Sequence, residues 1–148
     1  MNGQVIAFIG IALCVFLCGL GSAIGLYKTG SASSGVLAEN GSLFGKVIVL
    51  TLLPATQGLY GFVIGIIASG KAVEVQTIEQ GWAIFGATLA IAVMGLFSAI
   101  FQGKTAVAGI NAVAKNETIS GKLMLFPAMI EFYAILALVI SIILLNGI

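Results

Sequence analysis

The sequence predicts an all-α membrane protein with four transmembrane helices, arranged as two tandem hairpins of the same orientation. Three observations predict this class: strong hydrophobicity, four apolar runs of membrane-spanning length, and an internal repeat. Hydrophobic residues make up 60% of the 148 positions and charged residues 7%, with a mean hydropathy of +1.21. A water-soluble domain of this size exposes most of its residues and cannot hide so much apolar surface.

The four apolar runs define the expected helices in chain order. Each run is about as long as the ~20 residues that cross the hydrocarbon core of a bilayer. They cover residues 5–27, 47–70, 82–101 and 123–145, with short polar segments between them. The first run is too long for the core of a signal peptide, so we expect it to be retained as a span.

The lysines predict the topology of a multi-pass protein of the cell membrane. Segments 28–46 and 104–122 together hold five of the six lysines, whereas Lys71, between the second and third runs, is accompanied by two glutamates. Cytoplasmic loops carry an excess of basic residues. We therefore expect both lysine-rich loops in the cytoplasm and both termini outside. The net charge of +1 gives no reason to expect nucleic-acid binding.

The two halves of the chain repeat one another in parallel orientation. Residues 19–29 (GLGSAIGLYKT) align with residues 95–105 (GLFSAIFQGKT). After a three-residue gap, residues 53–60 (LPATQGLY) align with residues 126–133 (FPAMIEFY). Self-similarity of this kind indicates a duplicated structural unit, here a helical hairpin.

We therefore divide the single membrane domain into a first hairpin, residues 1–72, and a second hairpin, residues 73–148. Glu131 of the second hairpin aligns with Gly58 of the first, so one half carries a carboxylate at this level and the other does not. The first half is polar nearby, since Gln57 stands where the second half has Ile130. The second hairpin is expected to supply the charge and the first to supply polar neighbours.

Small residues recur on one face of the first and third runs, which lets membrane helices approach closely. The stripes comprise Ala7, Cys14, Cys18, Gly21 and Gly25, and then Gly95, Ala99 and Gly103. Two interpretations stay open: packing inside a four-helix bundle, or the crowded inner wall of a ring. We interpret the two cysteines as packing residues, because a disulfide across one helical turn has poor geometry and a metal site would need further ligands.

Glu131 is a lone carboxylate inside the apolar run 123–145. A charge near the middle of a membrane span costs several kcal/mol, so such residues are usually functional. The other ten charged side chains lie at or near the ends of apolar runs. Glu131 is therefore the expected centre of function.

Oxygen-bearing side chains are expected at the level of Glu131. Thr56, Gln57 and Tyr60 share one broad face of the second span. At ~1.5 Å per residue, Gln57 and Glu131 both lie roughly 21–23 Å from the outer ends of their helices. Counted from Gly81, Gln102 lies about 32 Å along the third helix on the same rise. It reaches this level if the third helix begins well outside the membrane.

This set of groups suits a small hard cation, which prefers oxygen ligands. The chain has no histidine, and no second carboxylate lies beside Glu131. Pro54 and Pro127, in register in the two halves, each remove a backbone hydrogen bond beside the polar residues. The alternative is a protonated glutamate hydrogen-bonded inside a packed bundle.

These features resemble the proteolipid rotor subunit of V-type ATPases, the duplicated four-helix relative of the two-helix F-type subunit. The resemblance covers essentially the whole chain: both hairpins, the glycine-rich first span, the carboxylate missing from the first half, and FPAMIEFYAIL around Glu131. The stretch LPATQGLYGFVIG, together with Gln102, is most similar to the sodium-pumping bacterial form, subunit K.

The resemblance implies a set of sodium ligands. These would be the backbone carbonyl of Leu53, the side chains of Thr56, Gln57 and Gln102, and the carboxylate of Glu131. Tyr60 would donate a hydrogen bond to Glu131 and keep the site closed. The ligand role of Leu53 rests on the resemblance alone.

The resemblance also implies how such a subunit works. About ten copies would form a closed ring in the lipid, with the first and third spans inside. A stator subunit would supply an arginine that pairs with Glu131, and the cytoplasmic loops would contact the central stalk. ATP hydrolysis would occur elsewhere in the complex, so this chain would be non-catalytic.

Three other functions compete with a sodium-carrying rotor, and one of them is a purely structural or pore-forming proteolipid with no exchange chemistry. A rotor of the same type could carry protons on Glu131. A small four-span cation/proton antiporter would also use an intramembrane glutamate, but such antiporters place it in the first span and lack this duplication.

Overall fold

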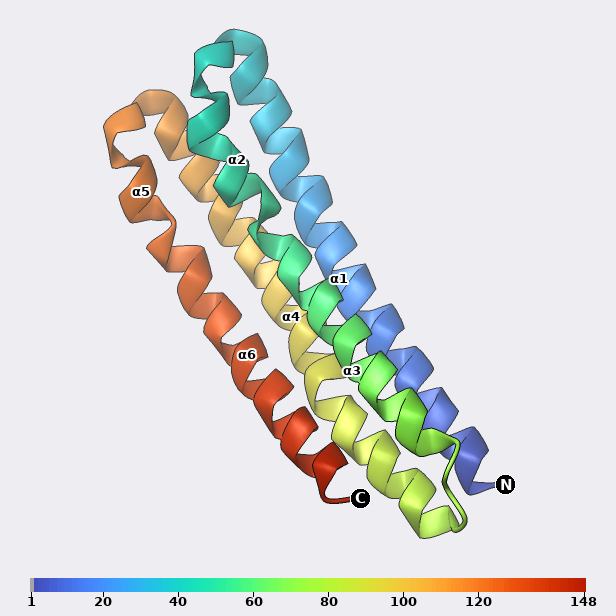
Figure 1. Cartoon of the computed structure of the whole chain (residues 1–148). Coiled ribbons are helices and arrows are strands. Elements are labelled where there is room, and N and C mark those ends of the chain that lie inside the picture. Colours follow the sequence, from blue (N-terminus) through green and yellow to red (C-terminus); the bar gives the residue numbers. More distant parts are fainter. Residues whose placement is uncertain (1) are drawn as a thin grey trace.

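The computed structural model describes residues 2–148, which form two antiparallel helical hairpins lying side by side (Figure 1). Within this part of the chain, four helices are long and apolar enough to cross a membrane: Gly3–Glu39, Gly41–Ala72, Ile78–Lys115 and Glu117–Asn146. Both chain ends lie at the same end of the bundle (Figure 1). The predicted all-α, four-span class is confirmed.

The first and third of these helices are continuous, and the second and fourth are assembled from shorter pieces. In chain order the elements are α1 (Gly3–Glu39), η1 (Gly41–Leu43), α2 (Phe44–Leu52), η2 (Leu53–Ala55), α3 (Thr56–Ala72), α4 (Ile78–Lys115), η3 (Glu117–Ile119), α5 (Ser120–Leu123) and α6 (Leu125–Asn146).

The same type of turn connects the two membrane-spanning helices of each hairpin. Asn40 and Asn116 have nearly identical backbone angles, with φ −148° and ψ 94° or 96°. Each asparagine side chain accepts a hydrogen bond of 3.1 Å from the N–H two residues ahead, that of Ser42 or Thr118. Asparagine is favoured here because its short side chain supplies a partner for an N–H that the helix start leaves unpaired. The repeat therefore extends to the turns.

The segments expected as loops are mostly helical, which corrects the sequence prediction. The α1 helix continues to Glu39 and α4 to Lys115, so only the short turns interrupt segments 28–46 and 104–122. The 37 residues of α1 span about 55 Å, well beyond the ~30 Å of a bilayer core. The helices outlast the apolar runs because their small and apolar residues keep packing against neighbouring helices.

Small residues hold α1 and α4 together along their length. A Cβ added at Gly21 would lie 2.7 Å from the Cα of Leu96, and one added at Gly103 would lie 2.7 Å from the Cα of Gly25. Cys18 is fully buried, and its Sγ donates to the carbonyl of Ile91 at 3.3 Å. The two small-residue stripes thus face each other within one chain.

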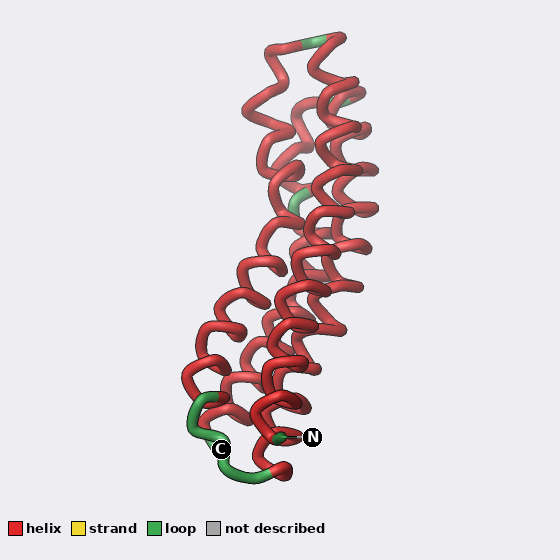
Figure 2. Tube along the Cα trace, turned by 90° about the vertical axis from the view of Figure 1, so that its right-hand side faces the viewer, coloured by secondary structure: helices red, strands yellow, loops and turns green. Residues whose placement is uncertain are grey.

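The second and fourth membrane helices are both interrupted next to their prolines. The 3-10 turn η2, which contains Pro54, separates α2 from α3. A single residue, Met124, separates α5 from α6, and α6 begins two residues before Pro127. The hydroxyl of Thr29 donates to the carbonyl of Thr51 at 2.7 Å, so α1 supplies a partner close to the first break. Figure 2 shows that the bundle bends along its length.

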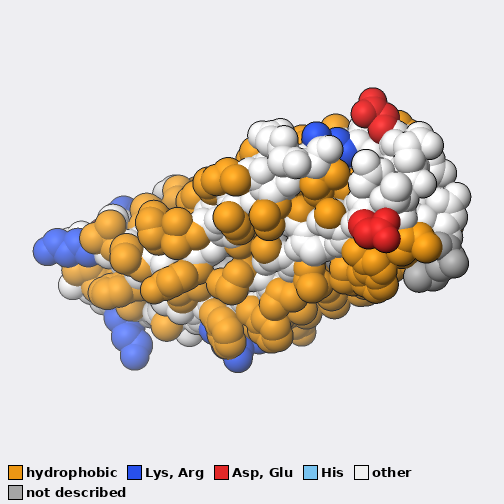
Figure 3. Space-filling view, turned by 90° about the horizontal axis from the view of Figure 1, so that it is seen from below, with side chains coloured by type: hydrophobic (Ala, Val, Ile, Leu, Met, Phe, Trp, Pro, Cys, Tyr) orange, Lys and Arg blue, Asp and Glu red, His pale blue; other side chains and the backbone are white. Residues whose placement is uncertain are grey.

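The flank of the bundle is apolar, as a membrane span requires. Hydrophobic side chains cover most of the face in Figure 3, and the acidic side chains visible there gather at one end. Large side chains such as Phe16, Phe62 and Leu136 are at least half exposed in the single chain. So large an apolar surface indicates contact with lipid or with other protein chains.

Candidate ion-binding site

The predicted site residues come from three helices that converge beside the proline breaks. The 3-10 turn η2 supplies Leu53, and the first turns of α3 supply Thr56, Gln57 and Tyr60. The middle of α4 supplies Gln102 and the second turn of α6 supplies Glu131. The prolines fix where α3 and α6 bend, and so help to set the height of these side chains.

The Glu131 carboxylate is held by two neutral donors on two other helices. Tyr60 Oη donates to Oε1 at 2.6 Å, and Gln102 Nε2 donates to Oε2 at 3.2 Å. Glu131 itself is only partly buried. Hydrogen bonds to a charged group are shorter and roughly twice as strong as those between neutral groups. The short Tyr60 bond therefore fixes the carboxylate on the side of α3.

Two glutamine amides lie fully buried behind the carboxylate. Gln57 and Gln102 have no exposed surface, and Gln57 Nε2 donates to Gln102 Oε1 at 2.8 Å. A buried amide left without partners would cost about 1–3 kcal/mol. Mutual pairing lets both amides stay in the apolar bundle next to Glu131.

Thr56 connects this pair to the backbone of η2. Its hydroxyl lies 3.3 Å from Gln57 Oε1 and 3.1 Å from the carbonyl oxygen of Leu53. One continuous run of hydrogen-bonding contacts therefore contains every site residue predicted from the sequence: Leu53, Thr56, Gln57, Gln102, Glu131 and Tyr60.

Gln102 reaches this level because α4 starts far beyond the end of α3. At ~1.5 Å per residue, Gln102 lies about 36 Å above the start of α4, and Gln57 about 22 Å from the end of α3. The non-helical connection between Ala72 and Ile78 descends past the end of α3 before α4 begins (Figure 1). This offset brings Gln102 to the level of Glu131.

Glu131 has no basic partner in the described part of the chain. The one ion pair among residues 2–148 joins Lys46 to Glu117 at 2.6 Å, at the ends of the hairpins. Within the same residues, no group of three or more His, Cys, Asp or Glu side chains is placed to hold a metal ion. A single carboxylate among neutral oxygens suits a proton or a small monovalent cation better than a divalent metal.

Comparison with known families agrees with this geometry. The sequence profile of the family described as the C subunit of ATP synthase matches the chain twice, over residues 9–68 and 85–144, which is more than half of its length. The chain belongs to this ATP synthase family of membrane proteolipids. Each match falls on one hairpin, so the family's repeating unit is present in tandem, as the internal repeat predicts.

Several proteolipid subunits are similar along nearly the whole chain. Identity is 43% to the V-type sodium ATPase subunit K of Enterococcus hirae, over 95% of this chain and 90% of that protein. It is 44% to the A-type ATP synthase subunit K of Methanocaldococcus jannaschii, over 97% of this chain and 63% of that protein. The 16 kDa proteolipid of the V-type proton ATPase of Nephrops norvegicus is 25% identical over 90% of this chain and 85% of its own length. The resemblance to V-type proteolipid subunits is confirmed.

One group in the site of this proteolipid was missed by the sequence prediction. The carbonyl oxygen of Pro127 accepts a hydrogen bond of 3.2 Å from Gln102 Nε2, the same nitrogen that faces Glu131. Pro127 and Glu131 are four residues apart and so lie on one face of α6. That spacing was the signal available in the sequence.

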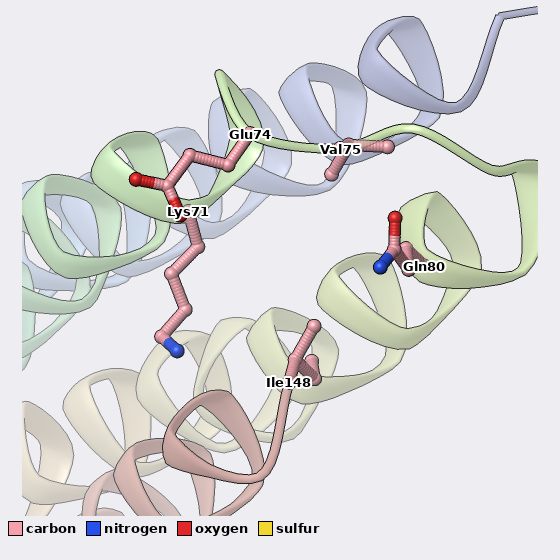
Figure 4. A pocket seen from close by; sticks show the side chains of 5 residues that line it. All are labelled: Lys71, Glu74, Val75, Gln80 and Ile148. Atoms are coloured by element: carbon pink, nitrogen blue, oxygen red, sulfur yellow. The ribbon is translucent and has the colours of Figure 1, made fainter.

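A separate hollow lies at the end of the bundle that carries both termini. It measures about 110 Å³ and is lined by Lys71, Glu74, Val75, Gln80 and Ile148 (Figure 4). Gln80 Oε1 already accepts from the N–H groups of Gln76 and Thr77 as part of the helix cap. With that oxygen occupied, the hollow lacks the converging oxygen set found at Glu131.

Proposed function

We propose that this chain is the ion-carrying subunit of the rotor ring of a V-type ATPase and that it binds Na+ at Glu131. One observation carries the proposal: the carboxylate stands among five oxygen-bearing groups in a single network with no basic partner among the described residues. The 43% identity to a protein named for a sodium ATPase supports the choice of ion. The antiporter alternative finds no support in the family match.

In this proposal the bound ion is coordinated by oxygen atoms alone. The ligands are the Glu131 carboxylate, the Thr56 hydroxyl, the amide oxygens of Gln57 and Gln102, and the Leu53 carbonyl. At present the Gln102 amide nitrogen faces the carboxylate. A cation would require the amide to turn by about half a rotation so that its oxygen faces the ion. Tyr60 would remain bonded to Glu131 and close the site.

A proton is the alternative cargo. Protonated Glu131 would need one acceptor for its own hydrogen and could keep the bond from Tyr60. That state leaves the Thr56 hydroxyl and the fully buried Gln57 amide without a direct role in holding the cargo. The surplus of oxygen groups is therefore the reason to favour Na+.

Ion binding would let the ring rotate through lipid. An ionised Glu131 facing hydrocarbon resists this movement by several kcal/mol, whereas a site loaded with Na+ is neutral. At the stator, an arginine of another subunit would pair with Glu131 and release the ion. ATP hydrolysis in a different part of the complex would drive rotation, so this chain binds and carries the ion without catalysing a reaction.

The same proposal sets the arrangement of the assembly. About ten copies would close into a ring, with α1 and α4 on the inner wall. The hairpins, residues 1–72 and 73–148, would place their Asn40 and Asn116 turns in the cytoplasm, against the central stalk. Both termini would lie on the outer side, as the lysine distribution predicts.

Carbodiimide labelling of Glu131 across a range of pH tests the choice of ion. We expect sodium at millimolar concentration or below to protect Glu131 from modification, at pH values where potassium at equal ionic strength does not. Protection should weaken as pH falls, because protons and sodium compete for one carboxylate. Equal labelling in the two salts would reject sodium and leave the proton rotor. Glu131→Gln, which removes the reactive group, provides the background.

A further inference from the structure

Two residues of α1 hold the end of α2, just before the break that carries the predicted Leu53 ligand. The unbroken α1 helix passes alongside α2 and α3 (Figure 1), and η2 packs directly against it. Thr29 Oγ1 donates to the carbonyl of Thr51 at 2.7 Å, the shortest of its contacts. One turn further along, Ser33 Oγ lies 2.6 Å from Thr51 Oγ1. Thr29 and Ser33 thus engage both the backbone and the side chain of one residue.

The direction of the bond between Ser33 and Thr51 follows from the neighbouring contacts. A hydroxyl has one hydrogen to donate. Thr51 Oγ1 donates its hydrogen to the carbonyl of Val47 at 2.8 Å, within its own helix. Ser33 is therefore the donor in its contact with Thr51. Thr29 and Ser33 are both buried, so bulk water does not compete for either bond.

The carbonyl of Thr51 needs the Thr29 hydroxyl because of the proline that follows. In a helix, a carbonyl is bonded by the N–H three or four residues ahead. Three residues ahead of Thr51 is Pro54, which has no N–H. Four residues ahead is Ala55, and in the 3-10 turn its N–H is directed to the carbonyl three residues before it, that of Leu52. Thr29 supplies the missing donor.

Leu53 lies between two positions that α1 holds. The Thr51 carbonyl comes before it, and after it Pro54 is buried against Gly25, where an added Cβ would lie 2.5 Å from the proline Cβ. The Leu53 carbonyl itself accepts from the N–H of Thr56 and, at 3.1 Å, from the Thr56 hydroxyl. The α1 helix therefore fixes the turn that carries the one backbone group of the predicted ligand set.

The second hairpin has no such arrangement. Thr29 and Ser33 correspond to Thr105 and Gly109, 76 positions later, as the alignment of residues 19–29 with 95–105 fixes. Thr105 Oγ1 donates within α4, to the carbonyl of Phe101 at 3.1 Å, and glycine has no hydroxyl. Both hairpins have a proline and a break at this level, so a proline break alone does not require these contacts. They are confined to the hairpin whose backbone supplies a predicted ligand.

We propose that Thr29, supported by Ser33, is a positioning residue of the sodium site, which holds η2 so that the Leu53 carbonyl faces the bound ion. This inference rests on the proposed function and adds two residues whose own hydrogen bonds do not reach Glu131. A buried carbonyl without a partner is costly. Without the Thr29 hydroxyl, the Thr51 carbonyl would compete for the Ala55 N–H, and the turn would rewind towards an α-helix. That rewinding would move the Leu53 carbonyl.

This role affects sodium and protons differently. Groups that orient a metal ligand commonly change metal affinity by about tenfold or more when they are removed. The Leu53 carbonyl would coordinate sodium, whereas a proton on Glu131 would be held by the carboxylate. The hydrogen bonds of Thr29 reach neither the carboxylate nor its donors, Tyr60 and Gln102. Loss of the Thr29 hydroxyl should therefore weaken sodium binding and leave protonation of Glu131 unchanged.

Sodium protection of Glu131 against carbodiimide, measured in the assembled ring, tests this role. We expect Thr29→Val, which keeps the shape and removes the hydroxyl, to raise the sodium concentration needed for protection by about tenfold. Thr29→Ser keeps the hydroxyl and should need nearly the same concentration as the unsubstituted ring. Without sodium, the pH dependence of labelling should be the same in all three rings.

The matched control is Thr105→Val, which removes the corresponding hydroxyl of the second hairpin and should leave protection unchanged. Full protection in Thr29→Val would overturn the inference, and so would equal losses in Thr29→Val and Thr29→Ser. Weaker protection together with an altered pH dependence would also overturn it, because the carboxylate itself would then be disturbed. Absence of sodium protection in the unsubstituted ring would instead reject the proposed sodium site.

A milder variant keeps the test decisive if Thr29→Val does not assemble into rings. Ser33→Ala removes the donor to Thr51 Oγ1 and leaves the bond from Thr29 to the Thr51 carbonyl in place. We expect a smaller loss of sodium protection, roughly two- to threefold. Ser34→Ala is its control, because Ser34 Oγ donates only to the Gly30 carbonyl of its own helix, at 2.8 Å. Equal protection in the two alanine variants would overturn the inference.

Discussion

The two hairpins share a fold but differ at the level of the ion site. In the first hairpin Gly58, Gly61 and Gly65 bring α3 close to α1, since a Cβ at Gly61 would overlap that of Cys18. The corresponding residues of α6 are Glu131, Ala134 and Leu138. In the first hairpin the two helices pack closely because these positions are glycine. In the second hairpin the corresponding positions carry side chains, including the Glu131 carboxylate.

Serine shows the same difference on the inner helices. Ser22 Oγ accepts a hydrogen bond of 2.8 Å from the Gly58 N–H, so α1 and α3 are bonded directly where the second hairpin has its site. Its counterpart Ser98 instead donates within α4, to the carbonyl of Gly95 at 3.5 Å. In the proposed ring this asymmetry gives one ion per four spans, and therefore fewer ions per turn than an unduplicated ring of similar size.

Removing the charge at Glu131 should have the largest effect. We expect Glu131→Gln to abolish ion transport and to leave ring assembly largely intact, because glutamine has the same shape and can still accept from Tyr60. Transport is measured in membrane vesicles and assembly by native gel. Glu117→Gln, at an exposed glutamate near the Asn116 turn, is the control and should retain transport. Residual sodium transport by Glu131→Gln would mean that the carboxylate is not the carrier.

Restoring a carboxylate to the first hairpin should fail to create a second site. A Cβ at position 58 would lie 3.1 Å from Ser22 Oγ, so Gly58→Glu would force α3 away from α1. Overpacking of this kind costs about 1–3 kcal/mol. We expect lower thermal stability of the ring and an unchanged amount of bound sodium per chain. Gly45→Glu, at an open position, should be neutral. Two sodium ions per chain in Gly58→Glu would show that the hairpins are interchangeable.

Much of this asymmetry could be predicted from the sequence because it resides in residue identity. The aligned glycine and glutamate at positions 58 and 131 show which half carries the charge. Helical spacing predicted that Thr56, Gln57 and Tyr60 share a face, and each lies in the site network.

The rest depended on features that periodicity does not encode. The level of Gln102 depends on how far the connection between Ala72 and Ile78 extends past the end of α3 before α4 begins. The length of this non-helical connection cannot be read from an apolar run. The helical ends beyond residues 27 and 101 contain many polar and small residues, and the packing of their apolar residues, such as Val36 and Ile110, keeps them helical. For the same reason, the sequence left open whether the glycine stripes face a neighbour or the same chain.

The two matching tyrosines offer a smaller test of the comparison. Tyr60 donates to Glu131, whereas its counterpart Tyr133 on α6 is 60% exposed. A hydrogen bond to a charged group contributes about 1.5–3 kcal/mol. We expect Tyr60→Phe to weaken sodium affinity by roughly tenfold or more, measured by sodium protection against carbodiimide. Tyr133→Phe should leave affinity unchanged. Equal effects of the two substitutions would exclude a specific role for Tyr60.

We expect the smallest effect on ring stability from removing the ion pair that joins the two hairpins. Lys46 and Glu117 form an ion pair of 2.6 Å between the end of the first hairpin and the turn of the second, with both side chains well exposed. Exposed pairs contribute at most about 1 kcal/mol and are screened by salt. Lys46→Ala should therefore shift the ring's thermal stability only slightly, and less still in high salt. A large, salt-independent loss would mean that the hairpins are joined mainly through this pair, and not through the glycine-lined contact of α1 with α4.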